Sequence, residues 1–247
     1  MKKFTLVLLL GFWFATFAFG ESADNFTFYV INGEITIDGY ISGPSEVVIP
    51  EQISGLPVVT IGEDAFFNTG LTSVIIPNSV TRIEKRAFCN NQLTSVIIPD
   101  SVTHIGDDAF SYNHFTSVII PSSVTHIGDS AFYKTQLRSV SIPGSVVHIG
   151  KSAFSKSQLT SVSFSRGVSH IGDWAFSENR LTSVTIPSSV THIGDSAFSN
   201  NQLTSITLPA NVDIHPVLFI TLYMKNTPKL KCSVIHLPFP YPRIIIS

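Results

Sequence analysis

Five histidines occupy one position of a pattern that repeats every 22 residues: His104, His126, His148, His170 and His192. Arg82 occupies the same position in the copy before His104. If successive copies stack as neighbouring strands, the imidazoles form a column about 5 Å apart. Neutral imidazoles bind transition metals, and adjacent protonated imidazoles repel each other. The column is therefore a candidate for metal binding or pH sensing.

The residues around this column do not complete a closed metal site. Four aspartates lie three residues after four of these histidines: Asp107, Asp129, Asp173 and Asp195. No carboxylate or cysteine recurs at a spacing that would close a site of three or four ligands. The simpler interpretation is a solvated position copied by duplication between inward-facing valine and isoleucine. We assign no metal and no cofactor, and keep the column only as a candidate.

Other reactive residues give no catalytic arrangement. The two cysteines, Cys89 and Cys232, are far apart and too few for a disulfide framework. Cys89 stands where other copies have Ser111 or Tyr133, which indicates a free thiol. The serines and histidines recur in every copy, so they do not indicate a catalytic triad, and no phosphate loop or dinucleotide fingerprint is present. We predict that the chain is not an enzyme.

These positions belong to a tandem repeat. Copies of Leu-Thr-Ser-Val-Ile-Ile-Pro begin at seven positions: Leu71, Leu93, Phe115, Leu137, Leu159, Leu181 and Leu203. A fixed period in this range indicates a solenoid, because each unit is too small to bury its apolar face and does so against its neighbours. The fold class predicted is a repeat solenoid.

Within one copy, the apolar residues mark the core side of the coil: Leu93, Val96, Ile98, Val102 and Ile105. Residues 96–98 alternate in–out–in, as in a short strand with one buried face. Pro99 ends this strand because proline cannot donate to a ladder. Ala109-Phe110 recurs in the other copies. We expect the phenylalanines to stack as a continuous spine of the core.

The motif Leu-x-x-Val-x-Ile-Pro-x-Ser-Val-x-x-Ile-Gly-x-x-Ala-Phe resembles the BspA-like leucine-rich repeat, also called the TpLRR class, over about residues 44–212. The resemblance implies a curved right-handed solenoid with a parallel β-sheet on its concave face. Members are typically exported or surface-attached proteins of bacteria and some protozoan parasites, and several are adhesins or antigens that bind host matrix proteins or other cells. Where the family often has cysteine after Ala-Phe, this chain mostly has asparagine: Asn91, Asn113, Asn179 and Asn201.

The chain divides into four segments. Residues 1–20 read as a signal peptide, because Lys2-Lys3 precede an apolar run and Ala18-Phe19-Gly20 resembles a cleavage site. Residues 21–46 have the alternation of a β-hairpin, which would cap the solenoid. The solenoid itself occupies 47–212. Residues 213–247 form an irregular basic tail.

The tail loses the repeat. Counting the period from Ile193 places His215 in the slot of a buried isoleucine. Alternating prolines at 238, 240 and 242 favour extended chain over helix. We interpret the tail as a divergent C-terminal cap; the alternative is a segment that did not evolve as a cap.

The charge composition and the N-terminal sequence limit the partners and the location that we expect. Charged residues make up 13% of the chain and the formal net charge is -2, so no general attraction to nucleic acid is expected. The apolar run at the N-terminus is short for a membrane span and is followed by polar residues. We predict an exported protein, at the cell surface, in the periplasm or secreted, with no membrane span in the mature chain.

Two outward positions of the repeat give the best candidate site. One carries serine in every copy, including Ser73, Ser95 and Ser117. The other carries isoleucine in the first three copies and serine or threonine afterwards: Ile75, Ile97, Ile119, Ser141, Ser163, Thr185 and Thr207. Exposed apolar surface marks interaction sites, and concave solenoid faces are usual binding surfaces. The alternative is that these isoleucines only satisfy β-propensity.

We therefore predict a leucine-rich-repeat module that binds a protein through the concave sheet face. It would be a monomer, acting as a cell-surface adhesin or antigen that contacts host matrix or cell-surface proteins. The alternative is a structural, envelope-associated repeat protein without a dedicated ligand, its surface shaped by duplication alone.

Overall fold

The computed structural model describes residues 23–209, 212–214 and 231–234, so the predicted signal peptide and most of the predicted tail lie outside the described residues. One short 3-10 helix, η1 (Ala23–Asn25), precedes strands that are nearly all short. The strands are β1 (Phe26–Ile31), β2 (Glu34–Tyr40), β3 (Glu46–Val48), β4 (Gln52–Ile53), β5 (Leu56–Ile61), β6 (Ser73–Ile75), β7 (Arg82–Ile83), β8 (His104–Ile105), β9 (His126–Ile127), β10 (Ser139–Ile142), β11 (His148–Ile149), β12 (Ser161–Phe164), β13 (His170–Ile171), β14 (Ser183–Thr185), β15 (His192–Ile193), β16 (Ser205–Leu208), β17 (Asp213–Ile214) and β18 (Lys231–Val234).

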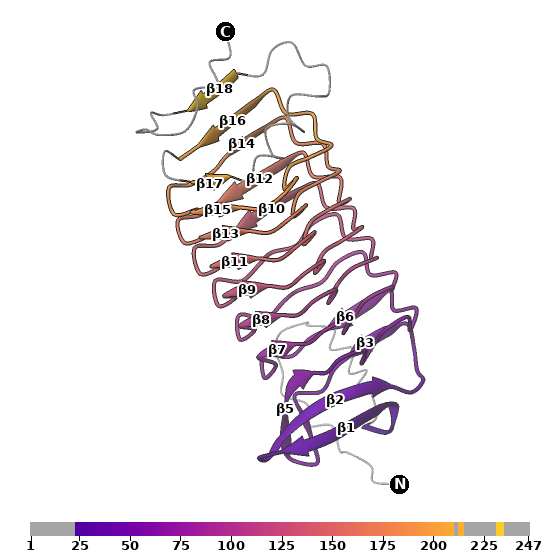
Figure 1. The fold of residues 1–247 in the computed structure, drawn as a ribbon. Helices are drawn as coiled ribbons and strands as arrows, with labels where there is room; N and C mark the ends of the chain where they lie inside the picture. Colours follow the sequence, from indigo (N-terminus) through magenta and orange to yellow (C-terminus); the bar gives the residue numbers. More distant parts are fainter. Residues whose placement is uncertain (1–22, 210–211, 215–230, 235–247) are drawn as a thin grey trace, which may run out of the picture.

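The chain winds into a parallel β-solenoid, as the repeat predicts (Figure 1). One sheet runs along its length in the order β1-β2-β5-β7-β8-β9-β11-β13-β15-β17, with β4 paired to β5. Within this sheet, each of the strands β7, β8, β9, β11, β13 and β15 is a dipeptide, Arg-Ile or His-Ile, in register with its equivalent 22 residues away. We call this part the His–Ile ladder. Sequence reasoning placed its isoleucines in the core but did not predict the strands.

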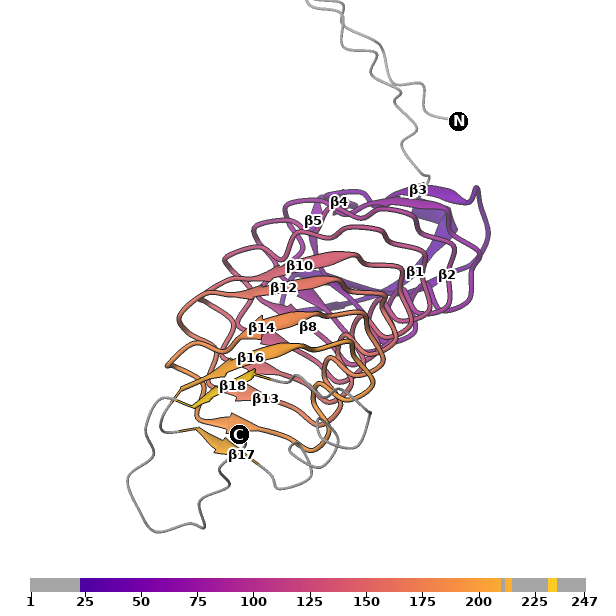
Figure 2. The same ribbon diagram turned by 90° about the horizontal axis from the view of Figure 1, so that it is seen from above.

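A second ladder, the Ser–Val ladder, lies on another side of the coil and is interrupted (Figure 2). It consists of the pair β3–β6, the pair β10–β12 and the group β14-β16-β18. The expectation of a strand in every copy is wrong for residues 95–98 and 117–120, where only an isolated bridge joins Ile75 to Ile97. Their burial still alternates, because alternation needs only an extended backbone, whereas a strand also needs paired neighbours.

A third side of the coil is built from tight turns around each Ala-Phe pair. The N–H groups of Asp108, Phe110 and Tyr112 donate to carbonyl oxygens of the next turn at 2.7, 2.9 and 2.8 Å. Two residues per turn adopt left-handed backbone with φ between 52 and 59°: Asp64, Asn68, Arg86, Asn90, Asp108, Tyr112, Ser130, Lys134, Ser152, Lys156, Trp174, Glu178, Ser196 and Asn200. This conformation is uncommon for residues other than glycine. The bonds to the next turn hold it in place.

The predicted phenylalanine spine is confirmed. Seven rings stack along the core: Phe66, Phe88, Phe110, Phe132, Phe154, Phe176 and Phe198. Successive centroids lie 5.1 to 5.5 Å apart, with ring planes 5 to 14° from parallel. All seven side chains are buried, so this stack is a large part of the apolar surface removed from water.

Asparagine side chains link four of the turns to the turns before them. The Asn113 Oδ1 accepts from the Leu93 N–H at 3.1 Å, and its Nδ2 donates to the Phe88 carbonyl oxygen at 2.9 Å. Asn91, Asn179 and Asn201 make equivalent bonds to their preceding turns. Asparagine at this position therefore satisfies backbone groups that would otherwise be buried without partners.

Both ends of the solenoid extend its ladders. At the N-terminal end β1 and β2 form the expected antiparallel hairpin, and β2 pairs in parallel with β5. At the other end Asp213 pairs with His192 and Ile214 with Ile193, a step one residue shorter than the period. The expectation that His215 falls in the isoleucine slot is therefore wrong. Among the described residues, no helix is long and apolar enough to cross a membrane.

Candidate binding face and histidine column

The isoleucine stripe, defined as Ile75, Ile97 and Ile119, is strongly exposed. The three side chains are 59, 83 and 83% accessible. Their neighbours in sequence point inward: Val96 and Ile98, for example, are buried on either side of Ile97. The strand-like alternation thus presents one β-branched side chain to solvent on each of three successive turns.

The serine row, defined as Ser73, Ser95 and Ser117, lies beside this stripe and is also exposed. All six residues predicted for the binding face are thus on the surface. Residues 72–75, 94–97 and 116–119 contain no charged side chain. Further along the coil the stripe position is taken by hydroxyls, of which Ser141, Ser163 and Thr185 are exposed. These turns therefore offer apolar contact and hydroxyl hydrogen bonds, and the exposed Glu46, in register with Ser73, adds a carboxylate at the N-terminal edge of the face.

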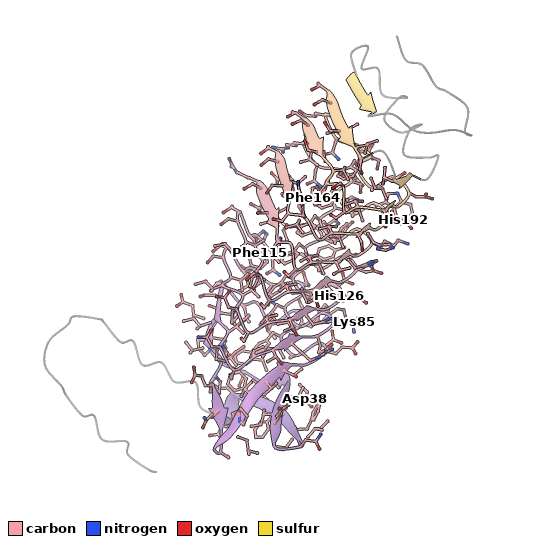
Figure 3. The ribbon with its side chains drawn as sticks, turned by 90° about the vertical axis from the view of Figure 1, so that its left-hand side faces the viewer. Asp38, Lys85, Phe115, His126, Phe164 and His192 are labelled. Atoms are coloured by element: carbon pink, nitrogen blue, oxygen red, sulfur yellow. The ribbon has the colours of Figure 1, made fainter. Side chains whose placement is uncertain are left out.

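The histidine column is stacked in register along the His–Ile ladder, as expected. His104 pairs with His126, His126 with His148, His148 with His170, and His170 with His192. Ring centroids are 5.9, 5.8 and 5.8 Å apart in three of these pairs. Figure 3 shows His126 and His192 along the same side of the coil.

The surroundings of two imidazoles favour their neutral form. Partial burial lowers the pKa of His104, and the positive charge of Arg82 lowers it further. Burial also lowers the pKa of His148, and the neighbouring imidazoles of His170 and His126 act in the same direction. Arg82 itself is paired with Glu84, Nε to Oε1, at 2.7 Å.

The aspartates beside the column have a structural role that sequence reasoning missed. Asp107 Oδ1 accepts from the Asp129 N–H at 2.8 Å, Asp129 Oδ1 from the Lys151 N–H at 2.7 Å, and Asp173 Oδ1 from the Asp195 N–H at 2.7 Å. Each carboxylate thus bonds the backbone of the next turn. The recurrence of aspartate every 22 residues could have predicted these bonds, because residues one period apart lie side by side on neighbouring turns of a solenoid.

Cys89 is a buried free thiol, as expected. Its Sγ accepts from the Ser111 Oγ at 3.1 Å, and burial raises the pKa of the thiol. A deprotonated, reactive sulfur is therefore disfavoured. Within the described part of the chain, no group of three or more His, Cys, Asp or Glu side chains is placed to hold a metal ion.

The N-terminal hairpin adds a second exposed apolar region. Phe28, Tyr29, Val30 and Ile31 are exposed along β1, the edge strand of the long sheet. The sequence indicated a strand here, but it did not indicate that both of its faces meet solvent. An edge strand of this kind has unpaired backbone groups beside its apolar side chains.

Solved structures similar to this chain are leucine-rich-repeat proteins. One from Bacteroides ovatus is 24% identical with a TM-score of 0.56, covering 79% of this chain and 67% of that one. A leucine-rich cell surface protein from Faecalibacterium prausnitzii is 23% identical with a TM-score of 0.44, covering 78% and 84%. The pneumococcal vaccine antigen PcpA is 22% identical with a TM-score of 0.46, covering 78% and 49%. At these identities the likeness concerns the fold alone.

The sequence comparisons give the family. Among curated proteins, none matches this chain. The family model of the BspA type leucine-rich repeat region matches six copies, over residues 45–159 and 125–227, which is more than half of the 247 residues. The chain belongs to the BspA-type leucine-rich-repeat family.

Proposed function

We propose that this protein is an exported, cell-surface binding protein of adhesin or antigen type, which contacts a protein partner through the isoleucine stripe and the serine row. One observation carries the proposal. Three exposed isoleucines stand in line on successive turns of a regular scaffold, in segments 72–75, 94–97 and 116–119 that contain no charged side chain. Exposed contiguous apolar surface of this kind marks sites of interaction.

The stripe can supply a useful part of a binding free energy. Burying an exposed isoleucine side chain contributes about 1.5–3 kcal/mol, and part of the sum is offset by the entropy lost on association. The serine row adds hydroxyl donors and acceptors beside the apolar contact. The partner surface expected is apolar at its centre, with polar groups that meet the serines.

The test is a binding assay against a panel of extracellular-matrix proteins, with wild type and the triple variant Ile75→Ser, Ile97→Ser, Ile119→Ser. The matched control removes three exposed apolar side chains away from the stripe, with Phe67→Ser, Tyr112→Ser and Val147→Ser. We expect the stripe variant to bind at least tenfold more weakly, and the control to bind like wild type. Equal losses in both variants would refute the assignment to the stripe.

The structural alternative predicts a different result. A repeat protein without a dedicated ligand retains no matrix or cell-surface protein, even as wild type. Protease treatment of intact cells tests the location, since a surface protein is cleaved without lysis. Light scattering tests the expectation that the protein is a monomer. If the protein is instead a dimer, and the stripe variant is still a dimer, the exposed edge strand β1 is the surface to test as the contact.

A further inference from the structure

The histidine column has a geometry that its sequence period alone does not give. Imidazoles on neighbouring turns are held in register by backbone pairing, so their separation is set by the ladder and not by side-chain contacts. His126, His148, His170 and His192 are exposed, and His104 is half-buried. Each imidazole therefore lies next to the imidazole of the histidine 22 residues away in sequence.

In two of the imidazoles, Nδ1 lies beside the hydroxyl of the preceding residue. His126 Nδ1 lies 3.0 Å from the Thr125 Oγ1, and His170 Nδ1 lies 2.7 Å from the Ser169 Oγ. Each hydroxyl donates its own proton to a carbonyl oxygen of the preceding turn, that of Thr103 or of Val147. A hydroxyl that donates to this carbonyl oxygen can accept from an imidazole Nδ1–H. With the proton on Nδ1, the lone pair lies on Nε2, which can then bind a metal ion.

Charged groups of both signs lie around the column. The carboxylates of Asp107 and Asp129 lie close enough to act on the imidazoles of His104 and His148. The positive charge of Arg82, at the N-terminal end of the column, is paired with Glu84. Aspartates thus lie three residues after His104, His126, His170 and His192, and Lys151 lies three residues after His148.

We propose that imidazoles on successive turns of this column chelate a divalent transition metal ion of the zinc, nickel or copper class, two nitrogens to each ion. Water completes the coordination, because the described residues offer no third protein ligand. Two bonds of about 2.1 Å place the nitrogens a little over 3 Å apart, which exposed rings on adjacent turns reach by rotating about their side-chain bonds. Such a site exchanges its metal readily, unlike a closed four-ligand site.

The test compares two double variants with equal numbers of histidines. His126→Asn with His170→Asn leaves His104, His148 and His192, no two of which are on successive turns. His104→Asn with His192→Asn leaves His126, His148 and His170 on three successive turns. Both keep His114, His215 and His236. Metal-stripped, untagged full-length protein is titrated with zinc chloride by calorimetry, and circular dichroism checks that each variant is folded.

We expect wild type and the variant with adjacent histidines to bind zinc, and the variant with alternate histidines to bind at least tenfold more weakly. That difference cannot come from histidine number, since the two variants have the same number. Equal affinities in the two variants would show that the imidazoles act singly, and a wild type without heat beyond dilution would show no site. Either result overturns the proposal. Both results concern only the histidine column, so they do not test the binding function proposed for the isoleucine stripe.

Discussion

Two backbone ladders cross the same turns of this solenoid, and only one of them is continuous. The His–Ile ladder pairs every turn from β7 to β15. The Ser–Val ladder loses its strands at residues 95–98 and 117–120. The interrupted turns carry Ile97 and Ile119, and the paired strands β10 and β12 carry Ser141 and Ser163 at the same position. By β-propensity alone the isoleucine turns are the better strands.

This difference indicates that the pairing of strands between turns of this coil does not follow the β-propensity of the residues. The turns stay in register at the interruption because the phenylalanine stack passes through it unbroken, with Phe88–Phe110 and Phe110–Phe132 centroids 5.4 and 5.5 Å apart. The face that carries the isoleucine stripe is therefore supported from the core and by the other two sides of the coil. It does not need its own ladder, so its outward residues are free to change.

The largest effect is expected from removing the shared support. Phe132→Ala deletes one ring of the stack, and a substitution of this kind lowers the free energy of unfolding by about 3–5 kcal/mol. Because both ladders rest on the stack, hydrogen exchange should accelerate at the Thr125 amide of one side and the Arg138 amide of the other. Denaturant unfolding and exchange measure this. Acceleration at only one of the two amides would mean that the ladders are supported separately.

A pair of proline variants tests the ladders directly. Thr125 donates its N–H to the Thr103 carbonyl oxygen at 3.1 Å, next to the His–Ile ladder. Thr125→Pro should therefore lower the free energy of unfolding by about 2–4 kcal/mol. Ile119 lies in the interruption, where no strand is formed. Ile119→Pro should lower it by about 1 kcal/mol or less, because no ladder bond is removed. Similar losses from urea unfolding would contradict the contrast between the two sides.

The asparagine links explain how the Ser–Val side is held, and they predict an intermediate effect. Asn179 Oδ1 accepts from the Leu159 N–H at 2.8 Å, just before β12. Asn179→Ala leaves several buried backbone groups without partners and should lower the free energy of unfolding by about 2–3 kcal/mol. Thr135→Ala, at the equivalent position, removes only hydroxyl bonds and serves as the control. Faster exchange in β12 for Asn179→Ala alone is the result expected.

The smallest change in stability is expected for Ile119→Thr, which tests what causes the interruption of the Ser–Val ladder. Ile119→Thr places on an interrupted turn the residue type that Thr185 provides in β14. The side chain is 83% exposed, so the free energy of unfolding should change by less than about 0.5 kcal/mol. Amides 117–120 should continue to exchange rapidly. If they become protected, the isoleucine itself causes the interruption, and the spacing of the turns does not.

Much of the fold could be predicted from the period. Residues that recur every 22 positions and are apolar must form columns in the core, which gave the phenylalanine spine and the burial of Val96, Ile98 and Ile105. The His–Ile ladder could not be predicted, because a two-residue strand is too short to show alternation. The left-handed backbone of Ser130 or Lys134 could not be predicted either, since nothing about these residue types favours it.

The candidate site shows the same limits. The exposure of Ile75, Ile97 and Ile119 follows from alternation, and the stacking of the histidines follows from the period. The Nδ1 atoms of His126 and His170 contact hydroxyls of the residues just before them, which the period does not predict. Those contacts come from Thr125 and Ser169, whereas Val147 precedes His148 and cannot make one. Single differences between copies thus carry the detail that the repeat hides.

The bonds between turns also determine how this molecule responds to force. The hydrogen bonds that join successive turns run along the axis of the coil, so a pull on its two ends loads the contacts between turns in series. Each turn should detach as a unit, starting from an end, because the interior turns are held on both sides. A released 22-residue turn adds about 75 Å of extended chain. Under tension, we therefore expect the solenoid to lengthen in equal steps.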